Sequence, residues 1–159
     1  MAQQAAGRDV SAEELIAAVR VHADRVHDAT RRLGCTADSA VEIVENSALD
    51  LVDALRGNPE SVSDLVGWWF ARARQLGRAA ADAEPDLPMG GGLLANDEVQ
   101  QQLAEALEQL PERERVAILM RDSYALPALS LATALGTTPD AALELVGRAR
   151  LDLLPALDD

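Results

Sequence analysis

TTPDAALELVGRAR, residues 137–150, follows the short apolar run LPALSLATALG at residues 126–136. The two segments together predict a helix, a turn at Gly136 and a second helix, which is the outline of a helix-turn-helix. The second helix of this motif normally enters a groove of DNA. Here it begins with Asp140 and carries leucine and glutamate where lysine and arginine would be expected. The sequence therefore predicts the fold of the motif with a surface unsuited to DNA.

The second helix of this pair has a predicted buried side and a predicted free side. Thr138 can cap the helix, and Pro139 suits the first helical position, where no backbone donor is lost. Apolar residues at spacings of three and four predict the buried side: Ala142, Val146, Ala149 and Leu153. Four residues outside this stripe are candidates for an exposed patch that binds a protein partner: Asp140, Leu143, Glu144 and Leu145.

Helical periodicity runs through the rest of the chain, and the alternation typical of strands is absent. Five further helices are expected, within residues 11–34, 36–59, 61–84, 96–111 and 112–125. Ser11 and Glu14 form a capping-box pattern at the first helix, and Gly34 ends it. Ser61 or Ser63 is expected to cap the third. The predicted fold class is all-α, with six or seven helices and no sheet.

One segment has the composition of a linker. AEPDLPMGGGLLAND, residues 83–97, contains two prolines and three consecutive glycines. The chain is therefore expected to form two small helical domains, residues 1–83 and 97–159, joined by a flexible linker at 84–96.

The chain is strongly acidic. Its 159 residues carry a net charge of −13, and all 14 basic residues are arginine. Residues 84–159 hold five Arg and fourteen acids, a net charge of −9 (5 − 14), so the half with the helix-turn-helix is the more acidic one. Such a surface repels phosphate backbones and anionic membranes. The sequence also has no apolar segment of signal-peptide or membrane-span length, which favours a cytoplasmic location.

No pattern of catalytic or ligand-binding residues stands out. The three glycines of the linker do not lie between a strand and a helix, as a phosphate-binding loop requires. His22 and His27 are five residues apart and fall on different faces of one helix, and Cys35 is the only cysteine. We therefore expect a protein that is not an enzyme and that binds no metal, cofactor or small-molecule substrate.

The C-terminal stretch resembles region 4 of the extracytoplasmic-function sigma factors of bacterial RNA polymerase. The resemblance covers residues 106–154, and its ordered elements are Leu110-Pro111, Arg113, Val116 to Met120, Leu131-Ala132, Leu135-Gly136 and Arg148-Ala149-Arg150. It implies a small helical domain with a helix-turn-helix that contacts promoter DNA in working members of the family.

The N-terminal domain resembles region 2 of the same family. AVEIVENSALDLVDAL, residues 40–55, is similar to the helix of the family that binds polymerase, and GWWFARARQLGRAAAD, residues 67–82, is similar to its tryptophan-led helix. The resemblance implies that the residues of the polymerase-binding face are Glu42, Glu45 and Asn46. Together the two resemblances cover almost the whole chain.

The chain departs from the family at its DNA-contacting positions. The basic cluster that ends region 2 is replaced here by three alanines and Asp82, and Leu143 and Leu145 stand where the recognition helix usually carries Lys and Arg. The residual candidates for nucleic-acid contact are Trp68, Trp69, Arg72, Arg74, Arg78 and Arg148. For the tryptophans, burial in the core is the alternative, and for the arginines of region 2 it is ion pairing on a solvated surface.

These features predict a sigma-like transcription regulator that acts mainly through protein contacts, with weakened or lost promoter binding. Its expected partner is the RNA polymerase core, an anti-sigma factor or another regulator. An atypical working sigma factor is the alternative, because tethering by polymerase lowers the affinity that each domain needs. A helical interaction domain unrelated to transcription is the third possibility.

Overall fold

The computed structural model describes residues 10–83 and 98–157. In these ranges the chain forms seven α-helices and no strand, which confirms the all-α prediction. None of the described helices is both long and apolar enough to cross a membrane. The contacts divide the chain into two compact units, Met1–Pro88 and Met89–Asp159. The predicted linker, residues 84–96, lies outside the described residues.

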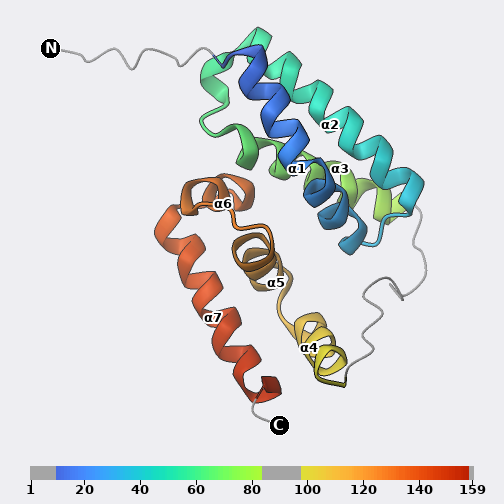
Figure 1. Ribbon diagram of the computed structural model, residues 1–159, viewed down its shortest axis with the longest axis vertical. Coiled ribbons are helices and arrows are strands. Elements are labelled where there is room, and N and C mark those ends of the chain that lie inside the picture. Colours follow the sequence, from blue (N-terminus) through green and yellow to red (C-terminus); the bar gives the residue numbers. More distant parts are fainter. Residues whose placement is uncertain (1–9, 84–97, 158–159) are drawn as a thin grey trace, which may run out of the picture. The chain divides into compact units, whose positions relative to one another are not determined.

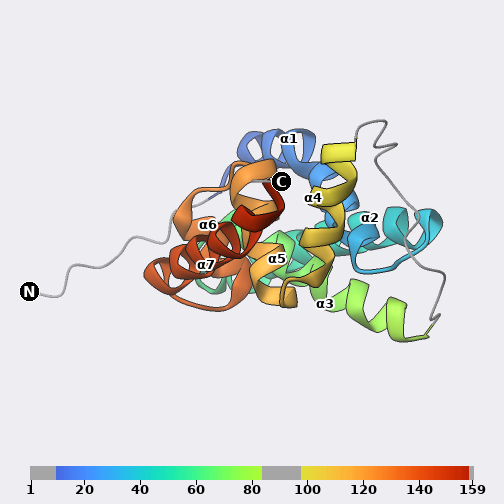
Figure 2. The ribbon, with the colours of Figure 1, turned by 90° about the horizontal axis from the view of Figure 1, so that it is seen from below.

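The first unit consists of three helices that pack on one another (Figure 1 and Figure 2). They are α1 (Ala12–Arg32), α2 (Ala37–Gly57) and α3 (Leu65–Ala83), with a 3₁₀ turn, η1 (Pro59–Ser61), between the last two. Large side chains from all three helices are buried in its core: Val26, Ile43, Leu51, Trp69 and Phe70. Because aromatic residues make up only 3% of the sequence, this core is mostly aliphatic outside that Trp–Phe pair.

Local hydrogen bonds set the helix ends of this unit. The predicted capping box is present, since Glu14 N donates to Ser11 Oγ and Ser11 N donates to the Glu14 carboxylate, both at 3.1 Å. Gly34 follows α1 with a φ of 99°, a conformation that glycine adopts without strain. The expectation of a serine cap on α3 was wrong. Asp64 caps this helix by accepting from Gly67 N at 2.8 Å, while Ser61 is held in the preceding 3₁₀ turn.

In its described residues, 98–157, the second unit contains four helices and one π-helical turn. They are α4 (Glu98–Gln109), α5 (Glu112–Ile118), the turn η2 (Leu119–Ser123), α6 (Ala128–Leu135) and α7 (Pro139–Leu157). α7 packs against α4, α5 and α6, so it forms the central element of this unit. Part of the core brings α4, α5 and α7 together. Leu103, Ala106 and Leu107 of α4 pack against a buried cluster of Leu110, Ile118, Ala149 and Leu153.

The helix-turn-helix prediction for residues 126–154 is confirmed at the level of local structure. α6 ends at Leu135 and is followed by Gly136, which has a φ of 65°, and Thr138 Oγ1 accepts from Ala141 N at 3.2 Å. Pro139 is the first residue of α7. The predicted buried side is buried throughout: Ala142, Val146, Ala149 and Leu153. The spacing of apolar residues alone was enough to predict these buried positions, because a helix that packs on a core must bury one continuous stripe of its surface.

Candidate protein-binding surfaces

The outer side of α2 is an acidic and apolar ridge. Glu42, Glu45 and Asn46 are all exposed, as the resemblance to region 2 implied they would be. Two aliphatic side chains flank them, Val41 and Leu49, with 48% and 61% of their surface exposed. A surface that combines carboxylates with exposed aliphatic groups matches a partner that offers both basic residues and apolar contact. We call these five residues the α2 ridge.

A shallow groove of about 350 Å³ lies between α2 and α3. Trp68 is half-buried along it, and Arg72 lies beside it. Arg72 Nε donates to Asp50 Oδ2 at 2.8 Å, and Arg72 Nη1 donates to Gln75 Oε1 at 3.2 Å. The charge of Arg72 is therefore already paired, as the ion-pairing alternative anticipated, and the groove offers little net attraction to a phosphate.

The other nucleic-acid candidates of this unit differ in their access to solvent. Trp69 is fully buried, and its Nε1 donates to Ser47 Oγ at 2.8 Å, so it is a core residue and cannot stack on a base. Arg74 is also buried, with 9% of its surface exposed. Arg78 is exposed near the end of α3. Of the candidates in the first unit, Arg78 is thus the most accessible cation.

The free side of α7 carries Asp140, Leu143 and Glu144, all exposed. Leu145 does not belong with them. Two residues along a helix are separated by roughly 200° of rotation, so Leu145 points to the opposite flank from Leu143, where it is half-buried. The four residues predicted as one patch therefore form two surfaces. Asp140 and Leu143 lie on one and Leu145 on the other, and Glu144 lies between them, where it lines the same groove as Leu145.

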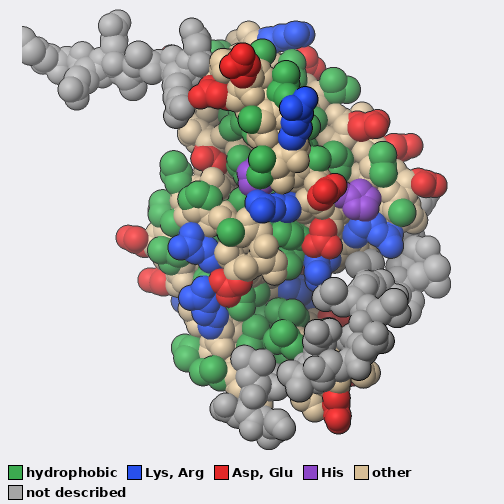
Figure 3. Space-filling view, in the orientation of Figure 1, with side chains coloured by type: hydrophobic (Ala, Val, Ile, Leu, Met, Phe, Trp, Pro, Cys, Tyr) green, Lys and Arg blue, Asp and Glu red, His purple; other side chains and the backbone are tan. Residues whose placement is uncertain are grey.

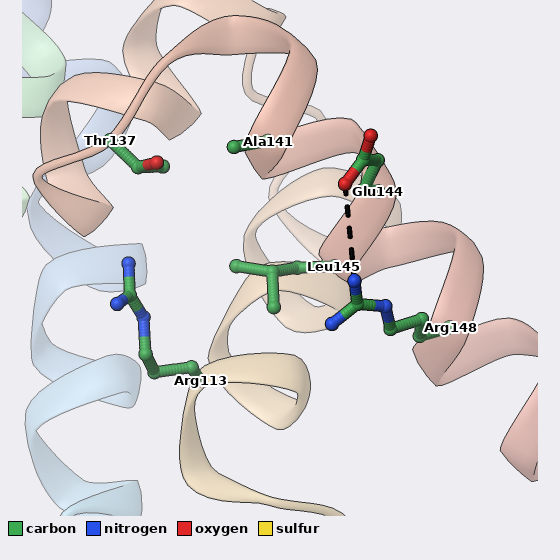
Figure 4. A pocket seen from close by; sticks show the side chains of 6 residues that line it. All are labelled: Arg113, Thr137, Ala141, Glu144, Leu145 and Arg148. Carbon is green, nitrogen blue, oxygen red and sulfur yellow. Dashed lines mark ion pairs between the residues drawn. The ribbon is translucent and has the colours of Figure 1, made fainter.

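Leu145 lines a groove of about 210 Å³ between α5 and α7 (Figure 4). Arg113 lies opposite Leu145, and its Nη2 donates to the carbonyl of Leu135 at 3.1 Å, at the end of α6. On the rim, Arg148 Nη2 lies 3.9 Å from the carboxylate of Glu144 in an exposed ion pair. Both arginines thus already have partners within the protein, although the pair of Arg148 with Glu144 is itself open to solvent.

The sequence patterns gave no sign of one ion pair that crosses this unit. Arg150 on α7 donates from Nε and Nη2 to the two carboxylate oxygens of Asp122 in η2, at 3.2 and 2.5 Å. These hydrogen bonds and the negative charge of Asp122 raise the pKa of Arg150 above its ordinary value. The two residues are 28 positions apart, so no local spacing rule could reveal the pair. On the face seen in Figure 3, arginine and acidic side chains are likewise intermingled.

The described residues contain no cluster of three or more His, Cys, Asp and Glu side chains that would hold a metal ion. Cys35 is buried, and its Sγ donates to the carbonyl of Gly77 at 3.2 Å. Burial raises the pKa of the Cys35 thiol, against a smaller lowering effect of Arg31. A neutral, buried thiol of this kind is a poor nucleophile.

His22 is a partly buried imidazole on α1. Its ring meets Phe70 edge to face, with ring centroids 6.3 Å apart, and Arg25 Nη1 lies 3.3 Å from its Nδ1. Burial and the charge of Arg25 lower the pKa of His22, against a smaller raising effect of Asp64. The fold therefore favours the neutral imidazole.

This lowered pKa predicts a pH dependence of stability. The unfolded chain keeps the ordinary histidine pKa of 6.5, so between the lowered pKa and pH 6.5 it binds the proton more readily than the folded chain. The contribution of His22 to the free energy of unfolding is thus complete above pH 6.5, and it is lost as the pH falls toward the lowered pKa. Urea unfolding can be followed by tryptophan fluorescence between about pH 7.5 and 5.5. The free energy of unfolding should decrease less over this range for His22→Gln than for the unmutated chain. His27→Gln on the same helix is the matched control, and equal decreases for His22→Gln and the unmutated chain would contradict the prediction.

Comparison with models of known protein families finds no match to this chain, and no curated protein matches it.

Proposed function

We propose that this protein is a sigma-like transcription regulator that acts through protein contacts and has lost most of its ability to bind promoter DNA. The observation that carries the proposal is the outward side of α7. In a helix-turn-helix this side would face the DNA groove, and here it presents Asp140, Leu143 and Glu144 to solvent. Phosphate contacts supply much of the affinity of DNA-binding proteins, and carboxylates at these positions oppose them.

The arginines of α7 do not offset the negative charge of these carboxylates. Arg148 faces Glu144, and Arg150 is held by both oxygens of Asp122. The carboxylates of Glu144 and Asp122 offset much of the positive charge that these arginines would offer to a phosphate, which would also approach a chain with a net charge of −13. The helix-turn-helix is therefore better suited to support a protein contact.

The α2 ridge supports a protein partner from a second, separate unit of the chain. It contains the positions at which the resemblance to region 2 implies polymerase binding, and all of them are accessible. Its carboxylates and its exposed Val41 and Leu49 suit a basic surface with apolar contact points. The RNA polymerase core is the first partner to test, and an anti-sigma factor is the second.

Charge reversal on the α2 ridge tests this proposal. The double variant Glu42→Arg/Glu45→Arg should bind purified bacterial RNA polymerase core at least about tenfold more weakly, because it places like charges against a basic surface. The loss should be larger at low salt, where charges are less screened. The measurement is a titration by surface plasmon resonance at two salt concentrations.

A matched control separates the ridge from the general change of charge. Glu13→Arg/Asp24→Arg makes the same change at two exposed positions of α1, and it should leave binding nearly unchanged. Equal affinities for the ridge variant and the unmutated protein would reject the α2 ridge as the contact. If neither polymerase core nor an anti-sigma factor binds the unmutated protein, both named partners are rejected, which leaves another regulator as the partner or a helical interaction domain unrelated to transcription.

The atypical working sigma factor remains the competing function, and the accessible Arg78 favours it. DNA binding distinguishes the two. At physiological salt the isolated protein should not shift a promoter fragment, whereas tight and sequence-specific binding in this assay would establish the working sigma factor instead.

A further inference from the structure

An exposed apolar stripe runs along α7 from Leu143 toward the C-terminal end of the helix. It consists of Leu143, Gly147, Leu151 and Leu154, spaced four, four and three residues apart, so all four lie on one side of the helix. The three leucines have 41%, 65% and 49% of their surface exposed. We call these four residues the α7 stripe. It lies apart from the buried stripe that holds α7 in its unit.

The packing of the second unit does not require a glycine at position 147. A Cβ built at this position would have no atom within 4 Å, so there is room for a larger residue. Glycine is the poorest helix former after proline, and it weakens the interior of α7 without an internal benefit. A backbone without a side chain does, however, allow another backbone to approach closely from outside.

Residues at equal distances before and after Gly147 are complementary to each other in size or charge. In LELVGRARL, residues 143–151, Leu143 and Leu151 stand four residues before and after Gly147, and Glu144 and Arg150 stand three residues before and after it. A second α7 running antiparallel and crossing at Gly147 therefore places leucine against leucine and glutamate against arginine, twice each. Reciprocal contacts of this kind are the mark of a twofold interface.

Arg150 can bind Asp122 of its own chain and Glu144 of the partner chain at the same time. Its bonds to Asp122 use two of the five N–H donors of the guanidinium, which leaves donors for the partner's Glu144. Seven residues from the centre the complementarity ends, because Leu154 would lie opposite the partner's Asp140. The matched stretch is thus residues 143–151.

From the exposed stripe, the uncrowded glycine and the reciprocal charges, we infer that two copies of this chain pair through α7, antiparallel and crossing at Gly147. The inference needs no residue of the α2 ridge, and it adds a second copy of the chain as one partner of the α7 surface that the proposed function assigns to protein contact. Leu143 and Glu144 belong to this interface, so the dimer and any partner that binds the same side of α7 exclude each other. A single helix pair is smaller than standard interfaces of about 1,200–2,000 Å², and both copies are acidic, so we expect a Kd on the order of tens of micromolar.

Sedimentation equilibrium of the full chain over a range of concentrations tests the pairing, and Gly147→Ala is the decisive variant. The added methyl group should raise the midpoint of thermal unfolding of the dilute protein by a few degrees, because alanine favours the helix and meets no neighbour. The same methyl group should weaken the dimer at least about tenfold by separating the two backbones. A loss of dimer with a gain in stability cannot come from misfolding.

The charge contacts have a matched control on the same helix. Glu144→Arg places arginine against the partner's Arg150 and should weaken the dimer about tenfold or more. Asp152→Arg makes the same change of charge at an exposed position outside the α7 stripe, and it should strengthen association slightly by reducing the overall repulsion.

Disulfide trapping tests the orientation. In a Cys35→Ser background, a mixture of Leu143→Cys and Leu151→Cys chains should form mixed disulfides under mild oxidation, while either variant alone should form few. Three results would each overturn the inference: a monomer at concentrations up to roughly 500 µM, a dimer that Gly147→Ala and Glu144→Arg leave intact, or disulfides that form within the Leu143→Cys variant alone.

Discussion

Trp69→Ala should cost the first unit about 3–5 kcal/mol of its free energy of unfolding, the typical cost of removing a large buried aromatic side chain. Trp69 is fully buried and joins α3 to α2 through its hydrogen bond to Ser47. Small domains have a total stability of about 5–15 kcal/mol, so this loss leaves the unit marginal. Both tryptophans of the chain lie in this unit, so the fluorescence of the remaining Trp68 reports its urea unfolding directly.

Three further variants separate packing from hydrogen bonding at this position. Trp68→Ala truncates the neighbouring, half-buried tryptophan and should cost clearly less. Trp69→Phe keeps an aromatic ring but removes the donor to Ser47, at an expected cost of about 1–3 kcal/mol. Adding Ser47→Ala to Trp69→Phe should recover part of that cost, because it removes the hydroxyl left without its donor. A midpoint for Trp69→Ala within experimental error of the unmutated chain would show that Trp69 is not in the core.

Leu131→Ala should destabilise the second unit by about 2–5 kcal/mol, since Leu131 is fully buried in α6. α6 packs on α7, and losing this support should also abolish the self-association through α7. The change should reduce the helical signal in circular dichroism at low urea, while the tryptophan fluorescence transition stays in place because this unit contains no tryptophan.

Leu129 provides the control on the same helix. It is exposed, so Leu129→Ala should change stability by no more than about 0.5 kcal/mol. If Leu131→Ala shifted the fluorescence transition as much as the helical signal, the two units would unfold as one cooperative structure, and their assignment as separate compact units would fail.

The two proposed contacts lie on different units, which makes their roles separable by experiment. The α2 ridge is carried by the first unit and the α7 stripe by the second. A ridge variant should lose the polymerase partner and keep the dimer, and Gly147→Ala should do the reverse. Failure of one proposal therefore leaves the other standing.

Much of the candidate site could be predicted because it follows from positions along a single helix. Glu42, Glu45 and Asn46 are exposed because the other side of α2 is buried through Ile43 and Leu51, and a 3.6-residue period fixes which side is which. The complementary residues on either side of Gly147 also belong to one helix. The inference of a dimer from them required the structure, which shows that the space beside the glycine is open.

Local chemistry was enough to determine the all-α class, the capping box at Ser11, the αL turn at Gly136 and the start of α7 at Pro139, because each depends on hydrogen bonds between residues three or four positions apart. The cap of α3 is equally local, since Asp64 and Gly67 are three positions apart, and the error there was the choice of a serine among neighbouring polar residues. The tertiary structure alone decided which of two adjacent tryptophans enters the core. It also decided that Arg150 reaches Asp122, and that Leu145 lies in a groove beside Arg113. These outcomes depend on how helices cross, and crossing angles are set by the packing of side chains that are distant in sequence.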